Sequence, residues 1–195
     1  MSPESHVSQA RGASLLLLVL LMARPAAAAE LAGVTMPDVV SVGKWRLVLN
    51  GLGLREATIF GIDVYVAGLY LPERTHDPDA ILREPGPKRL MMRMVRNVHR
   101  SYIAKAWSEG IRNGAGQDYP ALEERVSRLN TYVTDLKRGD TVTLTQVPGE
   151  GVILEINGTT LTTIPVDDFA RALWKIWLGD RPPNAGLKRG LLGLP

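Results

Sequence analysis

Hydrophobic and β-branched residues are densest in one early stretch of the chain, Leu47–Leu71. The stretch is rich in Val, Ile, Leu and Tyr, and it is interrupted at Asn50-Gly51 and again at Gly61, so it predicts strands joined by tight turns. In the second predicted strand, alternate residues point to opposite faces and both sets are largely apolar. We therefore expect a sheet that is covered on both faces.

Arg55 is the one arginine in this stretch. A guanidinium group keeps its charge, so inside a sheet it needs an anion, carbonyl oxygens or a wet cleft. The alternative is an arginine at a strand end whose side chain extends to solvent. The stretch alone favours neither interpretation.

The rest of the chain predicts two antiparallel meanders separated by helices, because the period of the apolar residues changes from about 2 to about 3.6 and back. The short dipeptide Asn157-Gly158 indicates a hairpin in the second meander. The tail, Arg181–Pro195, is expected to pack on the surface. The order of elements indicates one α+β domain with a large antiparallel sheet. The predicted elements are an opening strand or loop in Glu30–Val42, strand Lys44–Asn50, a helical turn at Asp79–Arg83, strand Lys88–Val95, helices over Asn97–Asn113 and from Pro120 to Gly139, strands Thr141–Gln146, Val152–Ile156 and Thr159–Ile164, and a helix over Asp168–Leu178.

The N-terminal residues have the pattern of a secretory signal peptide. His6 and Arg11 precede the apolar block Leu15–Met22, and Ala27-Ala28-Ala29 follows it. The block is too short to cross a bilayer comfortably, and the alanines form a cleavage site before Glu30. We expect residues 1–29 to be a signal peptide, residues 30–195 to be the mature domain, and the protein to be periplasmic or secreted. An uncleaved membrane anchor is the alternative.

Composition excludes several kinds of site. The chain of 195 residues has no cysteine and only three histidines, so no zinc cluster is expected. Its 23 basic residues are balanced by 20 acidic ones without a dense basic run, which argues against nucleic acid. Gly51-Leu52-Gly53 leads into a strand and is interpreted as a turn rather than a phosphate loop. We expect no cofactor, no metal and no G-x-S-x-G hydrolase site.

The remaining candidate chemistry is Arg55 together with one face of the helix predicted after residue 97. Tyr102, Lys105 and Glu109 follow each other at i, i+3 and i+7, on a polar face beside an apolar stripe that contains Trp107. Two cations and one phenol beside apolar walls suit a ligand with an anionic end and an apolar body. Alternatively, Lys105 and Glu109 form only an exposed ion pair, and Tyr102 only packs.

The motif Asn50-Gly51-Leu52-Gly53-Leu54-Arg55 is followed by the strand sequence Val64–Leu71. This pair of motifs resembles the chalcone isomerase superfamily, in particular its secreted bacterial branch. The resemblance extends through Arg96-Asn97-Val98 to Trp177-Leu178-Gly179-Asp180 and Leu191-Leu192-Gly193, and so covers nearly all of the predicted mature chain. It implies an open-faced β-sandwich, with a large antiparallel sheet, helices packed on one face, and a cleft between the sheet and the helices.

The resemblance also implies roles for individual residues. In the plant enzymes, an arginine attracts the phenolate of a chalcone, a helix tyrosine and a sheet threonine act on the carbonyl group, and a lysine lines the cleft. In fatty-acid-binding relatives the arginine and the tyrosine hold a carboxylate. Arg55, Tyr102 and Lys105 match these three positions. Three other positions depart from the enzymes: Tyr65 replaces a sheet threonine, Glu109 replaces an asparagine, and a residue near Ile176 replaces a threonine or serine of the last helix.

Three functions remain open from the sequence. The first is non-catalytic binding of a small amphipathic anion, such as a fatty or aromatic acid. The second is an intramolecular lyase of the chalcone-to-flavanone type, with Arg55, Tyr102 and Lys105 as catalytic residues. The third is an interaction protein with a vestigial cleft. The predicted ligand-binding set is Arg55, Tyr65, Tyr102, Lys105, Glu109 and Ile176. The sequence gives no indication of the oligomeric state.

Overall fold

A computed structural model describes residues 28–57, 61–165 and 168–195. The predicted signal peptide therefore lies outside the described residues, apart from Ala28 and Ala29, which begin the first strand. Nine strands and five α-helices are found in the described ranges. The strands are β1 Ala28–Leu31, β2 Val34–Pro37, β3 Val39–Val42, β4 Trp45–Ala57, β5 Ile62–Leu71, β6 Lys88–Met94, β7 Thr141–Val147, β8 Gly151–Ile156 and β9 Thr159–Ile164. The helices are α1 Pro78–Arg83, α2 Arg100–Ala115, α3 Tyr119–Thr131, α4 Asp168–Leu178 and α5 Ala185–Leu191, with a short 3-10 turn before α3.

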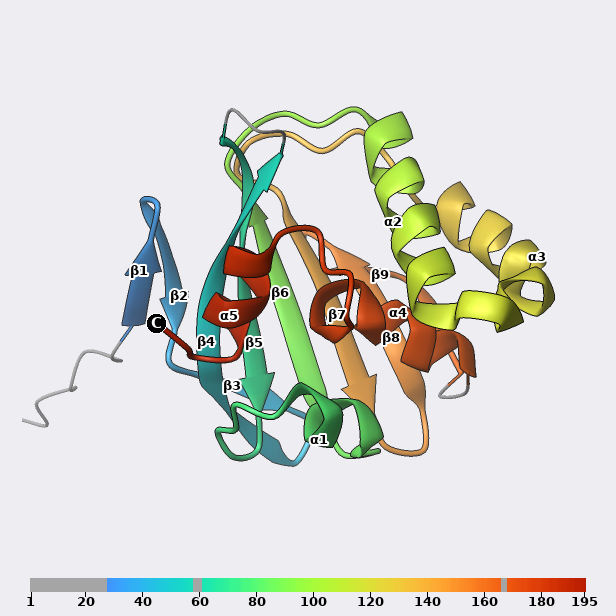
Figure 1. Ribbon diagram of the computed structural model, residues 1–195. Helices are drawn as coiled ribbons and strands as arrows, with labels where there is room; N and C mark the ends of the chain where they lie inside the picture. Colours follow the sequence, from blue (N-terminus) through green and yellow to red (C-terminus); the bar gives the residue numbers. More distant parts are fainter. Residues whose placement is uncertain (1–27, 58–60, 166–167) are drawn as a thin grey trace, which may run out of the picture.

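Strands β3 to β9 form one antiparallel sheet in which each strand pairs with the next one along the chain. The hairpin β1–β2 is a separate sheet of two strands beside β4 (Figure 1). Tight turns connect the later strands, and Asn157 and Gly158 both have positive φ, as the predicted hairpin requires. The α+β class and the large antiparallel sheet expected from the sequence are confirmed.

Apolar residues cover both faces of the sheet, as the two apolar faces of β5 predict. One face carries the main core, to which all five helices contribute; α4 and α5 lie across it in Figure 1. The opposite face carries a smaller cluster around the buried ring of Tyr70, which also contains Leu47 and Leu49. Alternate residues of β5 serve these two clusters, with Leu69 in the first and Tyr70 in the second.

The prediction of a turn at Asn50-Gly51 is wrong. Strand β4 runs without interruption through both residues, and the pairing with β5 shifts at this point: Leu49 pairs with Tyr70, but Gly51 pairs with Leu69. Asn50 is thus the extra residue of a β-bulge. Gly51-Leu52-Gly53 is likewise not a turn but the middle of the strand.

Two other boundaries differ from the prediction. Helix α3 ends at Thr131 rather than near Gly139, because residues 132–140 cross back to the sheet and Leu136 pairs with Val98. The tail does not pack on the surface: it contains α5, whose Leu187 and Leu191 are fully buried. Methyl groups at Gly51 or Gly53 would collide with backbone atoms of residues 187–193, so the two glycines allow α5 to lie directly on β4.

Candidate functional site

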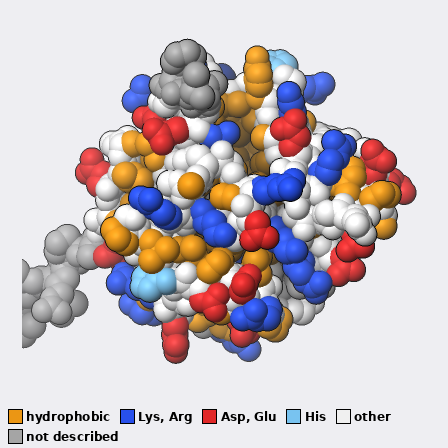
Figure 2. Space-filling view, in the orientation of Figure 1, with side chains coloured by type: hydrophobic (Ala, Val, Ile, Leu, Met, Phe, Trp, Pro, Cys, Tyr) orange, Lys and Arg blue, Asp and Glu red, His pale blue; other side chains and the backbone are white. Residues whose placement is uncertain are grey.

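A cavity of about 830 Å³ lies between helix α2 and the adjoining ends of β4, β5 and β6. Figure 2 shows a hollow on this side of the molecule with hydrophobic side chains at its base and Lys or Arg side chains on both sides. The volume falls in the range of about 300–1,000 Å³ that is usual for sites of small organic ligands. The apolar part of its wall includes Val64, Met92, Met94, Val98, Ile103, Trp107, Leu136, Val142, Ile176 and Trp177.

The β-bulge at Asn50 directs Arg55 into this cavity. Without a bulge, Arg55 would share a face with Leu47 and Leu49, because residues of a strand alternate. The extra residue reverses the alternation, so Arg55 pairs with Tyr65 on the face that carries the helices. The side chain of Asn50 holds the bulge: it donates to the carbonyl oxygen of Leu191 over 2.8 Å and accepts from the amide of Thr75 over 2.8 Å.

The Arg55 guanidinium has no acidic partner among the described residues. It lines the cavity and donates to the carbonyl oxygen of Glu56, its neighbour in the chain. The ion pairs found in the described ranges involve other arginines and lysines. Among the described residues, no carboxylate takes up the remaining N–H donors of this guanidinium, and such donors beside an apolar cavity suit an anion from outside.

Tyr65 lies beside Arg55 and is held by the last long helix. The indole N–H of Trp177 donates to the Tyr65 hydroxyl oxygen over 3.0 Å. Burial raises the pKa of Tyr65 to about 12, although the Trp177 hydrogen bond and the charge of Arg55 both lower it. The phenol is therefore neutral at physiological pH. Its O–H group is a second hydrogen-bond donor for an anionic ligand, beside the guanidinium.

Helix α2 contributes one face to the cavity, but Lys105 is not on that face. Residues of an α-helix follow each other at about 100° around its axis, so Tyr102, Ala106 and Asn113 lie close together on the wall. Lys105 lies outside this arc, and its ammonium pairs with Glu109 at 3.9 Å. The expectation that Lys105 takes part in the cleft is thus not met, whereas the exposed Lys105–Glu109 pair, the alternative interpretation, is present.

The other predicted residues do line the cavity. Arg55 and Tyr65 come from the sheet, Tyr102 and Glu109 from α2, and Ile176 from α4. Tyr102 is 71% exposed and stands at the edge. At Gly110, a methyl group would lie 2.8 Å from Cγ1 of Ile176, so this glycine allows α2 and α4 to meet at the wall. Binding by these residues stays a prediction.

Three cationic or titratable residues of the wall were not predicted. Arg96 and His99 lie in the connection between β6 and α2, and Arg181 lies between α4 and α5. His99 is 3.6 Å from a carboxylate oxygen of Asp135. Two of the three could have been found, because Arg96 belongs to a quoted family motif and Arg181 directly follows another.

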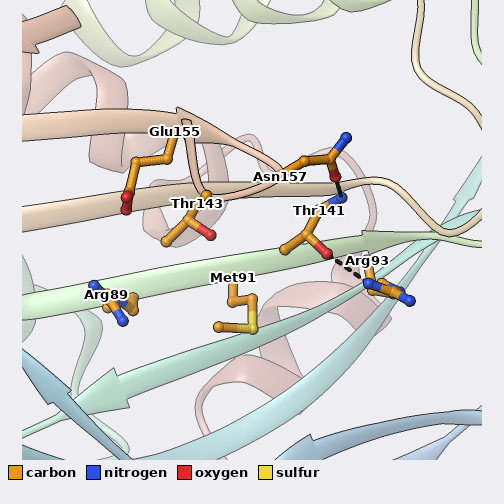
Figure 3. Close-up of a pocket in the computed structure, with 8 residues that line it drawn as sticks. Arg89, Met91, Arg93, Thr141, Thr143, Glu155 and Asn157 are labelled. Atoms are coloured by element: carbon orange, nitrogen blue, oxygen red, sulfur yellow. Dashed lines mark hydrogen bonds between the residues drawn. The ribbon is translucent and has the colours of Figure 1, made fainter. Parts of the chain in front are cut away.

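A second hollow lies on the opposite face of the sheet, and most of the residues that line it are polar. Figure 3 shows Arg89, Arg93 and Glu155 standing on β6 and β8 around Thr141 and Thr143. The Arg93 guanidinium donates to the Thr141 hydroxyl over 2.9 Å, and the Arg89 Nε–H donates to the Thr145 hydroxyl over 2.8 Å. Because these arginines have partners and Met91 is the one large apolar side chain among the lining residues, this hollow is the weaker candidate for an amphipathic ligand.

The described residues hold no group of three or more His, Cys, Asp or Glu side chains that could bind a metal ion. Among the same residues, no helix combines the length and the apolar character needed to cross a membrane. The donor set of the cavity, guanidinium and phenol groups, is suited to anions rather than to cations.

The fold and the cavity define an open-faced antiparallel sandwich with a ligand-sized apolar cleft under its helices. A family model described as chalcone isomerase-like matches residues 28–193, and the chain belongs to that family. The crystal structure of a fatty-acid binding protein of Arabidopsis thaliana is similar, with a TM-score of 0.67 and 17% sequence identity over 85% of this chain and 96% of that chain. At this identity the similarity shows the fold alone. No curated protein sequence matches the chain significantly.

Proposed function

We propose that this protein binds a small amphipathic anion, such as a fatty or aromatic acid, without catalysing a reaction. The observation that carries the proposal is a guanidinium without an acidic partner among the described residues, placed at the wall of an apolar cavity of about 830 Å³. Arg55 would anchor the anionic head, Tyr65 would donate a second hydrogen bond, and the apolar wall would contact the tail. The name of the Arabidopsis relative, a fatty-acid binding protein, supports this kind of ligand.

The lyase alternative receives less support from the geometry. It needs Lys105 near the carbonyl group of a substrate, but Lys105 lies outside the cavity wall and pairs with Glu109. An interaction protein with a vestigial cleft would not need Arg55 directed into the cavity, where no described carboxylate pairs with it. The predicted signal peptide supports a further part of the proposal, that the binding occurs after export to the periplasm or the medium.

Titration calorimetry with decanoate tests the proposal. A hydrogen bond to a charged group contributes about 1.5–3 kcal/mol, so Arg55→Ala should weaken decanoate binding about 10- to 100-fold. Arg46→Ala is the matched control, because Arg46 is an exposed arginine of the same strand and does not line the cavity. Equal affinities of wild type and Arg55→Ala for decanoate would show that Arg55 does not anchor the anionic head. Conversion of a hydroxychalcone to a flavanone, lost in Arg55→Ala, would instead favour the lyase.

A further inference from the structure

Three arginines from three separate parts of the chain line the cavity beside α2. Arg55 belongs to β4, Arg96 to the connection between β6 and α2, and Arg181 to the connection between α4 and α5. A binding site for a fatty acid needs only one of these guanidinium groups to pair with its carboxylate. The other two arginines, Arg96 and Arg181, are exposed at the cavity wall and are available to a ligand that carries more than one negative charge.

The backbone places Arg55 and Arg96 within reach of a common ligand. Arg55 pairs with Tyr65, and Tyr65 pairs with Met94, so the three lie in one row across three strands. Neighbouring strands are about 4.8 Å apart, and the row is therefore about 10 Å wide. Arg96 follows Met94 by two residues, and its connection is fixed by the bond of 3.0 Å from the Val95 amide to the Val64 carbonyl oxygen.

The connection that carries Arg181 is fixed to the same part of β4. The side-chain amide of Asn184 donates to the carbonyl oxygen of Leu54, directly before Arg55, over 3.1 Å. Pro182 and Pro183, which lie between Arg181 and Asn184 in the chain, also line the cavity. A long guanidinium side chain from each of the three sites can thus approach one head group near Arg55 and Tyr65.

Protein carboxylates do not balance these charges within the described part of the chain. No ion pair joins Arg55, Arg96 or Arg181 to a described acidic residue. Glu109 is the acidic side chain among the described lining residues, and Lys105 pairs with it. A ligand with one negative charge would pair with one of these guanidinium groups and leave the exposed Arg96 and Arg181 with water as their partner.

We propose that the preferred ligand is an amphiphile whose head group is a phosphate monoester. The proposal rests on the proposed function and specifies the ligand of the same cavity. A phosphate monoester carries about 1.5 to 2 negative charges at pH 7 and offers three acceptor oxygens on one compact group. Guanidinium groups bind phosphate oxygens in pairs of parallel hydrogen bonds, so several arginines can share one phosphate.

Decyl phosphate, decyl sulfate and decanoate test the proposal by titration calorimetry on the whole chain. The three probes share a tail, and the sulfate has the same three terminal oxygens as the phosphate but one charge. At pH 8, decyl phosphate should bind at least about 10-fold more tightly than decyl sulfate. Between pH 8 and pH 5 this preference should fall several-fold, because the second proton of a phosphate monoester binds near pH 6. Other titratable and charged groups of the wall, namely His99 with Asp135, Glu109 with Lys105, Tyr65 and Tyr102, act on both probes, and the sulfate measures their contribution.

Two variants separate this proposal from the proposed function. Arg96→Gln and Arg181→Gln should each reduce the preference for phosphate over sulfate about 10-fold while decanoate binding changes little. Arg100→Gln, an exposed arginine at the start of α2 that does not line the cavity, should leave all three affinities unchanged. Equal binding of phosphate and sulfate, with no effect of either variant and loss of decanoate binding only in Arg55→Ala, would overturn the phosphate proposal and keep the monoanion site. Absence of binding by all three probes would overturn both.

Discussion

The indole N–H of Trp177 and the hydroxyl oxygen of Tyr65 form a hydrogen bond of 3.0 Å between residues 112 positions apart in the chain. The bond joins α4 to strand β5 at the cavity wall, to which both side chains contribute. It orients the phenol beside Arg55 and satisfies a buried indole donor. The geometry of the candidate site therefore depends on how α4 packs on β5.

Replacing Tyr65 by phenylalanine should destabilise the protein by about 1–3 kcal/mol, because the Trp177 donor would be left buried without an acceptor. Urea unfolding followed by fluorescence measures the effect. Tyr102→Phe, in an exposed side chain, is the control and should leave the free energy of unfolding unchanged. In the double variant Tyr65→Phe with Trp177→Phe, the loss should be smaller than the sum of the two single losses. Strict additivity would argue against the bond.

Two of the five tyrosines should ionise late in the folded protein. Burial raises the pKa of Tyr65 and that of Tyr70 to about 12, compared with about 10 in an unfolded chain. Tyrosine absorbance during an alkaline titration should show a late phase, from which Tyr65→Phe and Tyr70→Phe each remove one equivalent.

Stability should follow the same shift, with a defined sign. Because the folded pKa is raised, the contribution of Tyr65 to the free energy of unfolding is complete below pH 10 and is lost as the pH rises to about 12. Relative to wild type, Tyr65→Phe should become less destabilised over this interval. A constant difference between pH 9 and pH 12 would contradict the raised pKa.

Lys88 is buried, and its ammonium caps the end of α1 by donating to the carbonyl oxygens of Ile81 and Glu84 over 2.6 and 2.7 Å. Lys88→Met should destabilise the protein by about 1–3 kcal/mol, because two carbonyl oxygens lose their donor. Lys44→Met, an exposed lysine before β4, is the control in urea unfolding.

The cost of Lys88→Met should grow at alkaline pH. Burial lowers the pKa of Lys88 to about 8, while Glu84 raises it. Between about pH 8 and pH 10.5 the unfolded chain binds more protons at this position, so wild type gains stability relative to Lys88→Met as the pH rises. A difference that shrinks over this interval would show that the folded state does not lower the pKa.

Alanine at Gly53 should weaken the contact between β4 and α5. A methyl group there would meet the backbone of Leu187, and overpacking of this kind costs about 1–3 kcal/mol or displaces the helix. The free energy of unfolding measures it. Gly186→Ala is the matched control within α5, since its methyl group would meet only a side-chain atom of Asn184 at 3.6 Å. It should be neutral or stabilising, because alanine favours a helix more than glycine does.

Asn50→Ala should affect both stability and the site. The variant removes the partners of the Leu191 carbonyl oxygen and the Thr75 amide, at a cost of about 1–3 kcal/mol. Because the bulge at Asn50 sets the direction of Arg55, decanoate binding should also weaken. Asn113→Ala, an exposed amide on α2, should change stability little. Unchanged binding in a destabilised Asn50→Ala variant would show that the bulge persists without its side-chain bonds.

Local patterns along the chain predicted most elements of the fold, because strand alternation, helical period and turn chemistry are encoded within a few residues. The strand Lys88–Met94, the hairpin at Asn157-Gly158 and the helix Asp168–Leu178 are examples. The same local rules predicted a turn at Asn50-Gly51, since these two residues usually form one. The deciding partners are α5 and Thr75, which lie elsewhere in the chain.

The sequence predicted the parts of the candidate site that depend on the chemical properties of individual residues. Arg55 was identified because a permanent charge in an apolar stretch needs a polar partner or access to water. Lys105 lies only about 40° around the axis of α2 from Glu109, yet outside the arc that lines the cavity, a difference that spacing alone does not resolve. Arg181 reaches the cavity wall through a loop whose position depends on the bond between Asn184 and Leu54.

The contact of α5 with β4 has a consequence for folding kinetics. The bond from Asn50 to Leu191 closes a loop across 141 positions, so a large entropy loss must precede any gain from it. Until that closure occurs, the main chain of β4 at Gly51 and Gly53 is not covered by α5, and it is accessible to water or to another polypeptide. Slow refolding, with a transient species that associates with its own copies as concentration rises, is the behaviour expected of such a topology.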